Sequence, residues 1–155
     1  MGLRDILFLI GFISLCLAVG GVSGYFTVAG AREWFPTLVK PSFNPPSWLF
    51  APVWTVLYIM MGIAAWLVWR QGGDIHLALW MFFIQLGLNF LWSFLFFSLR
   101  RIDVALVEIL VLWISIATTL YLFWGVDQRA GLLLVPYLAW VSFASLLNAA
   151  FWRLN

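Results

Sequence analysis

Charged residues are scarce in this chain. Six acidic and eight basic residues together make up only 9% of its 155 residues, whereas an ordinary soluble domain carries about a quarter. So few charges cannot cover a water-exposed surface, and composition therefore excludes a single soluble domain. The eight bases are scattered and the net charge is only +2, so the basic stripe that nucleic-acid binding requires is missing as well.

Cysteine and histidine are nearly absent. The one cysteine, Cys16, excludes a disulfide framework, and we interpret it as a small apolar filler. The one histidine, His76, excludes paired-histidine haem ligation within one chain, and no metal-ligating carboxylate lies near it in sequence. The sequence also shows no phosphate loop, no dinucleotide fingerprint and no nucleophile, base and orienter that could act together. It therefore predicts no metal, no resident cofactor and no conventional enzyme activity.

Hydrophobic residues are abundant, at 65% of the chain. The charges leave five long apolar stretches, and each exceeds the roughly 20 residues that a membrane-spanning helix needs. Because these runs do not alternate with period two, they do not indicate a β-barrel. The sequence predicts an all-α membrane protein with a single domain over residues 1–155. Its five expected helices lie near 6–26, 48–69, 77–99, 104–124 and 130–152.

The connections between these helices indicate how they are arranged. Three are short, which favours an up-down bundle of antiparallel neighbours. The first loop, at about 27–47, is long and contains four prolines, of which Pro45 and Pro46 fix an extended backbone before the next helix. We expect this loop to form a lid. Three bases fall on the N-terminal side and five on the other, which predicts a cytoplasmic first loop and C-terminus.

The eleven tryptophans exceed what an interfacial belt explains, and they suggest a flat aromatic or sterol-like ligand. Three helices carry aromatic, polar or small residues at a spacing of four, which places them on one helical face. Two interpretations stay open: helix–helix packing and hydrogen bonding, or the walls of a ligand cavity. The residues concerned are Trp54, Tyr58 and Gly62; Gln85, Asn89 and Ser93 with the adjacent Trp92; and Trp140, Ala144 and Asn148.

Two further features concern structure. Glu108 is an acid within an expected span, where acids are costly and often functional, but we favour a structural role in which it snorkels to the membrane interface or pairs with Arg100 or Arg101. Gly20 and Gly24 form a small-xxx-small pattern at which two backbones can approach closely. It predicts a homodimer with its seam on the first or third helix. The alternative is that these glycines pack within their own bundle.

Four segments resemble a known family. They are EWFPTLVKPSFNPPSW at 33–48, APVWTVLYIMMGIA at 51–64, QLGLNFLW at 85–92 and PYLAWVSFA at 136–144 with the following Leu147 and Asn148. In this order they are similar to the tryptophan-rich sensory protein/translocator protein family (TspO/MBR), which includes the peripheral benzodiazepine receptor. The resemblance covers nearly the whole chain, and the block of KPSFNPP and PVWTVLY is long and specific.

The resemblance implies a five-helix bundle of bacterial-membrane type, with the first loop covering a cavity. It implies protoporphyrin IX or another tetrapyrrole as ligand rather than cofactor, synthetic benzodiazepine-site ligands as further ligands, and a homodimer. Trp34, Trp54 and Trp140 would be the tryptophans of the cavity, Asn89 its amide and Ala144 a small wall residue. The complete set of ligand-binding residues that we predict is Trp34, Pro45, Pro46, Trp54, Tyr58, Asn89, Trp92, Trp140, Ala144 and Leu147.

The chain departs from the family pattern at two places. Phe43 stands where family members often have tryptophan, in the expected lid. Ala149 stands at the tyrosine position of the cholesterol motif of animal members, before Arg153, so a sterol is a weaker expectation than a porphyrin.

Three functional interpretations follow. The first is a receptor, sensor or transporter-like protein for porphyrins. The second is a light-dependent porphyrin-degrading enzyme in which Trp34 and Trp140 donate electrons. The third is a structural regulator of another membrane complex, which needs no accessible cavity.

Overall fold

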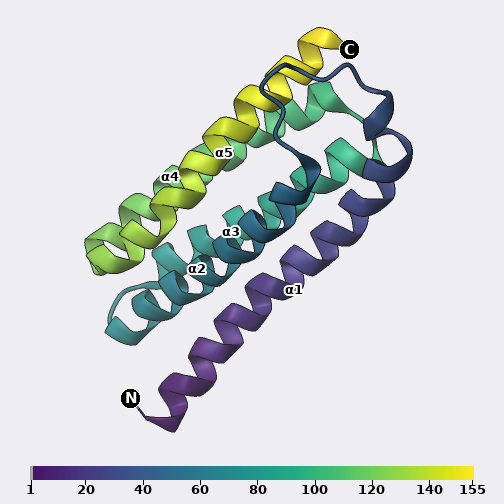
Figure 1. The fold of residues 1–155 in the computed structure, drawn as a ribbon. Helices are drawn as coiled ribbons and strands as arrows, with labels where there is room; N and C mark the ends of the chain where they lie inside the picture. The colour runs from purple at the N-terminus through teal and green to yellow at the C-terminus, as the bar shows by residue number, and fades with distance from the viewer. Residues whose placement is uncertain (1) are drawn as a thin grey trace.

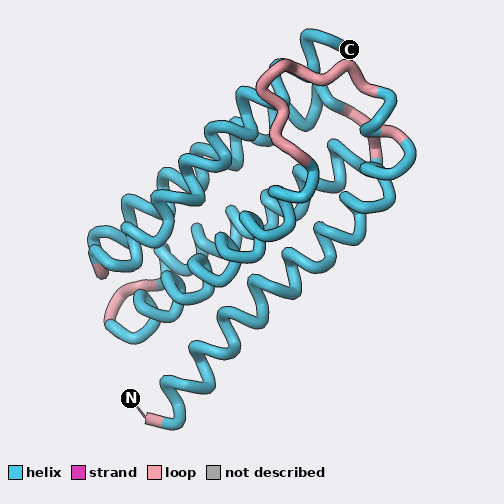
Figure 2. Tube along the Cα trace, in the orientation of Figure 1, coloured by secondary structure: helices cyan, strands magenta, loops and turns pink. Residues whose placement is uncertain are grey.

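The computed structural model describes residues 2–155, and this part of the chain is helical without any strand. Five long helices are joined by short turns and by one longer loop (Figures 1 and 2). The elements in chain order are α1 (Leu3–Glu33), η1 (Phe35–Thr37), η2 (Ser47–Leu49), α2 (Phe50–Gln71), α3 (His76–Ser93), η3 (Phe94–Ser98), α4 (Ile102–Val126) and α5 (Gln128–Leu154).

Each of the five long helices in residues 2–155 is long and apolar enough to cross a membrane. They run up and down, so the N-terminus lies at one end of the bundle. The C-terminus and the first loop lie at the other end (Figure 1), which we call the loop end. The prediction of an all-α bundle of five spanning helices is confirmed, and the chain is an integral, multi-pass membrane protein.

The first helix is longer than predicted. It continues to Glu33, whereas the sequence placed its end near Phe26 and assigned Arg32 and Glu33 to the loop. That expectation was wrong because nothing between these positions breaks a helix, and the first proline after them is Pro36. The loop is correspondingly shorter, and it begins at Trp34, the C-cap of α1.

The other helix ends follow ordinary backbone chemistry. Helix α2 ends at Gln71 and is followed by its C-cap Gly72, which has a φ of 66° that favours glycine. Helix α3 passes directly into η3, a π-helical turn, and Arg100 after it adopts a φ of 55°. Helix α5 begins at Asp127, whose Oδ1 accepts a hydrogen bond of 2.9 Å from the backbone N–H of Arg129.

Asp127 also binds side chains from two segments. Its Oδ2 accepts hydrogen bonds from Arg129 Nη2 at 2.9 Å and from Gln71 Nε2 at 3.0 Å. The hydrogen bond to the Arg129 side chain holds the pKa of the Asp127 carboxyl below its ordinary value. This carboxylate therefore joins the end of α2 to the start of α5 outside the spanning segments.

Helix α1 is attached to the bundle at two places. In its first half it packs on α2, where Gly62 lies so close to the Ile13 backbone that a Cβ on Gly62 would come within 2.6 Å of Ile13 Cα. In its last turns it packs on η3, where Gly30 meets the Phe97 backbone and leaves no room for a side chain. The tight packing on α2 continues as far as Gly20, where a Cβ would lie 2.6 Å from the Tyr58 ring. Between Gly20 and Gly30, α1 lines open space instead, and this separation positions the site.

Candidate functional site

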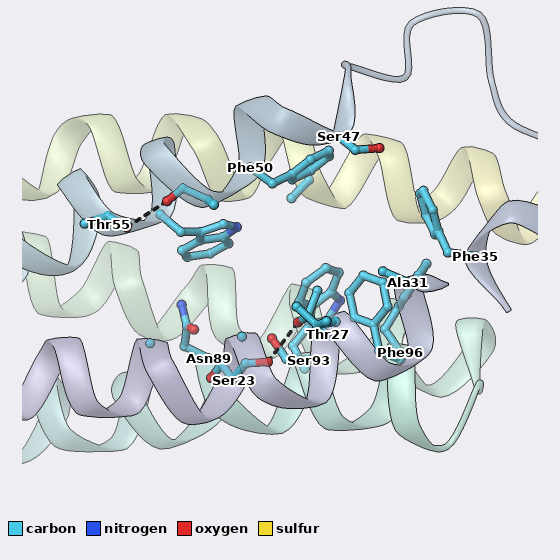
Figure 3. A pocket seen from close by; sticks show the side chains of 18 of the residues that line it. Ser23, Thr27, Ala31, Phe35, Ser47, Phe50, Thr55, Asn89, Ser93 and Phe96 are labelled. Carbon is cyan, nitrogen blue, oxygen red and sulfur yellow. Dashed lines mark hydrogen bonds between the residues drawn. The ribbon is translucent and has the colours of Figure 1, made fainter. Parts of the chain in front are cut away.

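A cavity of about 670 Å³ lies in the loop-end half of the bundle. Its walls come from α1, α2, α3 with η3, and α5, and the described part of α4 contributes none of its lining residues. Figure 3 shows Ser23, Thr27 and Ala31 of α1 facing Phe50 and Thr55 of α2 across the open space. A volume of this size is typical of sites that enclose a small organic ligand.

Tyr58 and Asn89 form the polar end of the cavity, which lies away from the loop. Tyr58 Oη donates a hydrogen bond of 2.5 Å to Asn89 Oδ1, and Asn89 Nδ2 donates one of 2.8 Å to Tyr137 Oη. Tyr137 Oη in turn donates to Gln85 Oε1 at 2.8 Å. This chain of side chains joins α2, α3 and α5, and within residues 2–155 one N–H of Asn89 has no partner.

The structure distinguishes helix–helix hydrogen bonding from cavity lining for Gln85, Asn89 and Ser93. All three are buried, but they serve different purposes. Gln85 does not line the cavity and joins helices, as the packing interpretation has it. Asn89 and Ser93 both line the cavity, and Asn89 also joins helices. The face thus changes from structural to cavity-lining within two helical turns.

Aromatic rings supply most of the apolar wall. The Trp54 ring lies 5.7 Å from that of Tyr58 at an angle of 32°. The Trp140 ring meets Phe50 edge-on at 5.9 Å. On the opposite side, Trp92 donates from Nε1 to Asn148 Oδ1 at 3.0 Å, which fixes its indole between α3 and α5. Indoles held in this way present flat faces to whatever occupies the space.

Most predicted site residues surround this cavity. Its lining includes Trp54, Tyr58, Asn89, Trp92, Trp140, Ala144 and Leu147. The other three predicted residues, Trp34, Pro45 and Pro46, are not among the lining residues. Trp34 packs edge-on against Phe96 at 5.6 Å, and Phe96 itself lines the cavity. The two prolines precede η2 at the loop end and position Ser47, which does line it. Ligand contact by any of these residues stays a prediction.

The first loop is fastened at the loop end. Asn155 Oδ1 accepts a hydrogen bond of 2.8 Å from the Val39 N–H, and Asn155 Nδ2 donates one of 3.1 Å to the Val39 carbonyl. Phe43, the loop residue that departs from the family pattern, meets the ring of Phe143 edge-on at 6.3 Å. Both contacts hold the loop against α5, as a lid over this end of the bundle requires.

The sequence pointed to only one residue of α1 that lines the cavity: we expected Arg32, together with Lys40, to be a candidate partner of porphyrin propionates, but we placed both on the loop. Gly20, Ser23, Gly24, Thr27 and Arg32 all line the cavity. Ser23 is 95% buried, because its relative exposure is 5%, and its hydroxyl has no hydrogen-bond partner within residues 2–155. The small residues that recur in this stretch indicate a helix face that leaves open space. Because the predicted helix ended near Phe26, this face was not identified from the sequence.

One structural expectation is wrong. Glu108 pairs with neither Arg100 nor Arg101, because Arg100 lies 3.8 Å from Glu33 and Arg101 binds Asp103 at 2.8 Å. Glu108 is instead buried, and neither carboxylate oxygen has a hydrogen-bond partner among residues 2–155. It falls on the face of α4 that packs into the bundle, which the sequence could not orient.

Gly20 and Gly24 differ in their surroundings. A Cβ on Gly20 would lie 2.6 Å from the Tyr58 ring, so Gly20 packs within its own bundle. At Gly24 a Cβ would meet no atom within 4 Å. The homodimer itself stays a prediction.

Comparison with known proteins agrees with the resemblance seen in the motifs. The model of the TspO/MBR family matches residues 12–153. The tryptophan-rich protein TspO of Chlorobaculum tepidum is 48% identical, with 98% of each chain covered. The tryptophan-rich sensory protein of Cereibacter sphaeroides is 38% identical over 93% of this chain and 90% of its own. The translocator protein of Bos taurus is 35% identical over 94% and 89%. The chain therefore belongs to the TspO/MBR family, as a five-helix membrane protein of the translocator and sensory protein type.

Proposed function

We propose that this protein is a membrane receptor, sensor or transporter-like protein that binds porphyrins, with protoporphyrin IX as the reference ligand. The observation that carries the proposal is the cavity of about 670 Å³ walled by the indoles of Trp54, Trp92 and Trp140. A tetrapyrrole is a flat, mostly apolar ring, and aromatic faces are the surfaces on which such a ring packs best. The accessible cavity also favours ligand binding over a purely structural role in another complex.

Free polar groups in the cavity support a ligand that carries acceptors as well as an apolar body. Within residues 2–155, one N–H of Asn89 is free, and the Ser23 hydroxyl has no partner. The indole N–H of the lining residue Trp140 is buried and is also without a partner in this part of the chain. Buried donors of this kind are costly unless a ligand or water satisfies them.

A titration tests this proposal directly. Protoporphyrin IX is added in the dark to the purified protein in detergent, and binding is followed by the shift of the porphyrin absorption band. We expect saturable binding that Trp54→Ala weakens. Trp80→Ala is the matched control, because Trp80 is 66% exposed on the outer face of α3 and does not line the cavity. Failure of the wild type to saturate, or equal losses in both variants, would overturn the proposal.

A second candidate function is light-dependent degradation of the bound porphyrin. It is favoured by the position of Trp140, an indole in the cavity wall that could donate an electron to a light-excited ring. Trp34 is the second donor that we proposed, although it reaches the cavity only through Phe96. Illumination of the protein with bound porphyrin tests this function. Loss of the porphyrin band in the wild type, with Trp34→Phe or Trp140→Phe still binding but no longer degrading, supports this function. A stable band rules it out.

Two further proposals concern assembly and orientation. We propose a homodimer through the outward faces of α1 or α3, and a cytoplasmic loop end, because five of the eight bases lie there. Chemical cross-linking in membranes tests the dimer. Labelling of a cysteine introduced at the exposed position Ser42, in intact and opened cells, tests the orientation.

A further inference from the structure

One lining residue of the cavity is charged. The remaining lining side chains are apolar, hydroxyl or amide groups, and Arg32 on the last turn of α1 is the exception. No aspartate or glutamate lies among the lining residues of the described chain. The loop end of the cavity therefore carries one positive charge, and nothing else that lines the cavity neutralises it.

Glu33, which follows Arg32 in sequence, and Asp103 both contact other arginines. Glu33 lies 3.8 Å from Arg100, and Asp103 binds Arg101 through two hydrogen bonds of 2.9 and 2.8 Å. Within residues 2–155 the Arg32 guanidinium has neither an ion pair nor a hydrogen bond to another side chain. Its place in the last turn of α1 suits the helix dipole, which favours a cation there. The dipole accounts for the charge but not for its position on the cavity wall.

Lys40 differs from Arg32 both in its contacts and in its position relative to the cavity. Its Nζ lies over the Phe35 ring at 5.2 Å from the ring centre, and Lys40 is not a lining residue. Arginine also binds a carboxylate through two parallel hydrogen bonds, whereas lysine acts as a point charge. Arg32 and Lys40 thus differ, because Arg32 lines the ligand space and Lys40 does not.

We propose that Arg32 is a specificity-determining residue that selects ligands with a carboxylate on one edge of a flat apolar body. This inference rests on the proposed function, because it assigns a direction to the ligand inside the same cavity. The apolar body lies against Trp54 and Trp140, and the carboxylate lies at the loop end against the guanidinium. At that end a charged group remains near water, so the ligand does not have to bring its charge into the centre of the membrane.

A pair of ligands that differ only in charge tests the inference. Protoporphyrin IX and its dimethyl ester share the ring, and only the acid carries carboxylates. We expect the wild type to bind the acid about tenfold more tightly than the ester, the order of magnitude of one charge-assisted hydrogen bond. Arg32→Gln should remove this preference by weakening acid binding about tenfold while ester binding stays unchanged. Added salt should weaken acid binding and leave ester binding unaffected.

Two variants complete the design. Lys40→Gln removes a nearby charge of the same sign, and it should leave both affinities at the wild-type level. Arg32→Lys keeps the charge without the planar fork, and it should recover part of the preference. Unchanged ester binding in Arg32→Gln shows that the cavity is still folded.

The outcomes separate the two proposals. Wild type that binds acid and ester equally, with no effect of Arg32→Gln, overturns the role of Arg32 and leaves porphyrin binding standing. Equal losses of acid and ester in Arg32→Gln, or the same loss in Lys40→Gln, overturn it too. Wild type that binds neither ligand overturns both proposals.

Discussion

Gly20 and the ring of Tyr58 are in direct contact, and an ideal Cβ on Gly20 would lie only 2.6 Å from two ring carbons of Tyr58. This contact is the last point at which α1 and α2 pack tightly before the cavity begins. It also holds the Tyr58 ring in place while its hydroxyl binds Asn89. Gly20 therefore supports the polar end of the cavity without offering any polar group of its own.

Substitution of Gly20 should destabilise the bundle. Gly20→Leu forces the Tyr58 ring or the α1 backbone to move, and overpacking of this kind costs about 1–3 kcal/mol. We expect a lower thermal midpoint in detergent, measured by circular dichroism. Gly11→Leu is the control on the same helix, because a Cβ there meets no atom within 4 Å. Equal midpoints for the two variants would show that the Gly20 contact is not tight in solution.

Gly24 should respond differently from Gly20. It lines the cavity, and a Cβ there meets nothing within 4 Å. Gly24→Leu should therefore leave the thermal midpoint near that of the wild type while it occupies cavity volume and weakens porphyrin binding. The measurement pairs a melting curve with a porphyrin titration. A large loss of stability without a change in affinity would contradict this division.

The Tyr137 hydroxyl should contribute measurably to stability. Tyr137→Phe removes the partner of both Asn89 and Gln85. Hydrogen bonds between membrane helices contribute about 0.6 kcal/mol on average and up to about 1.7, so we expect a loss of that order in reversible unfolding by denaturing detergent. Tyr121→Phe is the control, because Tyr121 is 78% exposed and distant from the network. A loss no greater than that of Tyr121→Phe would mean that the network contributes nothing to stability.

The two substitutions of Trp140 should differ. Trp140→Phe keeps an aromatic ring in the cavity wall, whereas Trp140→Ala removes it. By analogy with the truncation of buried aromatic residues at interfaces, Trp140→Ala should cost about 1–3 kcal/mol of porphyrin affinity, and Trp140→Phe should cost less. Titration in the dark measures both. Wild-type affinity in both variants would remove Trp140 from the site.

The Asp127 carboxylate predicts a dependence of stability on acid pH. Its pKa is lowered in the folded chain, chiefly by the hydrogen bond from the Arg129 side chain. A lowered pKa means that its stabilising contribution is complete above the ordinary value of 3.8. The contribution is lost as the pH falls below that value through the lowered pKa. When the pH is lowered from 7, the thermal midpoint of the wild type should decrease once the pH is below 3.8. Asp127→Asn should flatten that part of the curve, and parallel curves would show that other groups cause the decline.

The sequence predicts the number and order of the helices because the few charges mark their ends. It also predicts that Asn89 and Ser93 share a face, because helical periodicity is a local property. The hydrogen-bond partner of Asn89 could not be predicted from local periodicity. Tyr137 is 48 residues away, and only the assembled bundle, in which both α3 and α5 pack on α4, brings the two side chains together. The same limit explains Glu108, whose direction depends on how α4 is rotated within the bundle.

The C-terminal end of α1 is the difference between prediction and structure that most affected the predicted site. A single charge at Arg32 was interpreted as the water-exposed edge of the membrane, but a basic residue also suits the last turn of a helix. With the helix ended near Phe26, Thr27 and Arg32 fell on a loop, where Arg32 and Lys40 were equal candidates for a ligand carboxylate. Because α1 continues to Glu33, Arg32 lies on the cavity wall and Lys40 does not.

The length of α1 relates the cavity to the thickness of the bilayer. Its 31 residues span about 46 Å at 1.5 Å per residue, whereas the hydrocarbon core of a typical bilayer is about 30 Å thick. Helix α1 must therefore tilt or extend beyond the core, and the degree of tilt follows the thickness of the membrane. Because one face of α1 is a wall of the cavity, a change in that tilt changes the width of the cavity. A thin and a thick membrane should hold this protein with cavities of different shape.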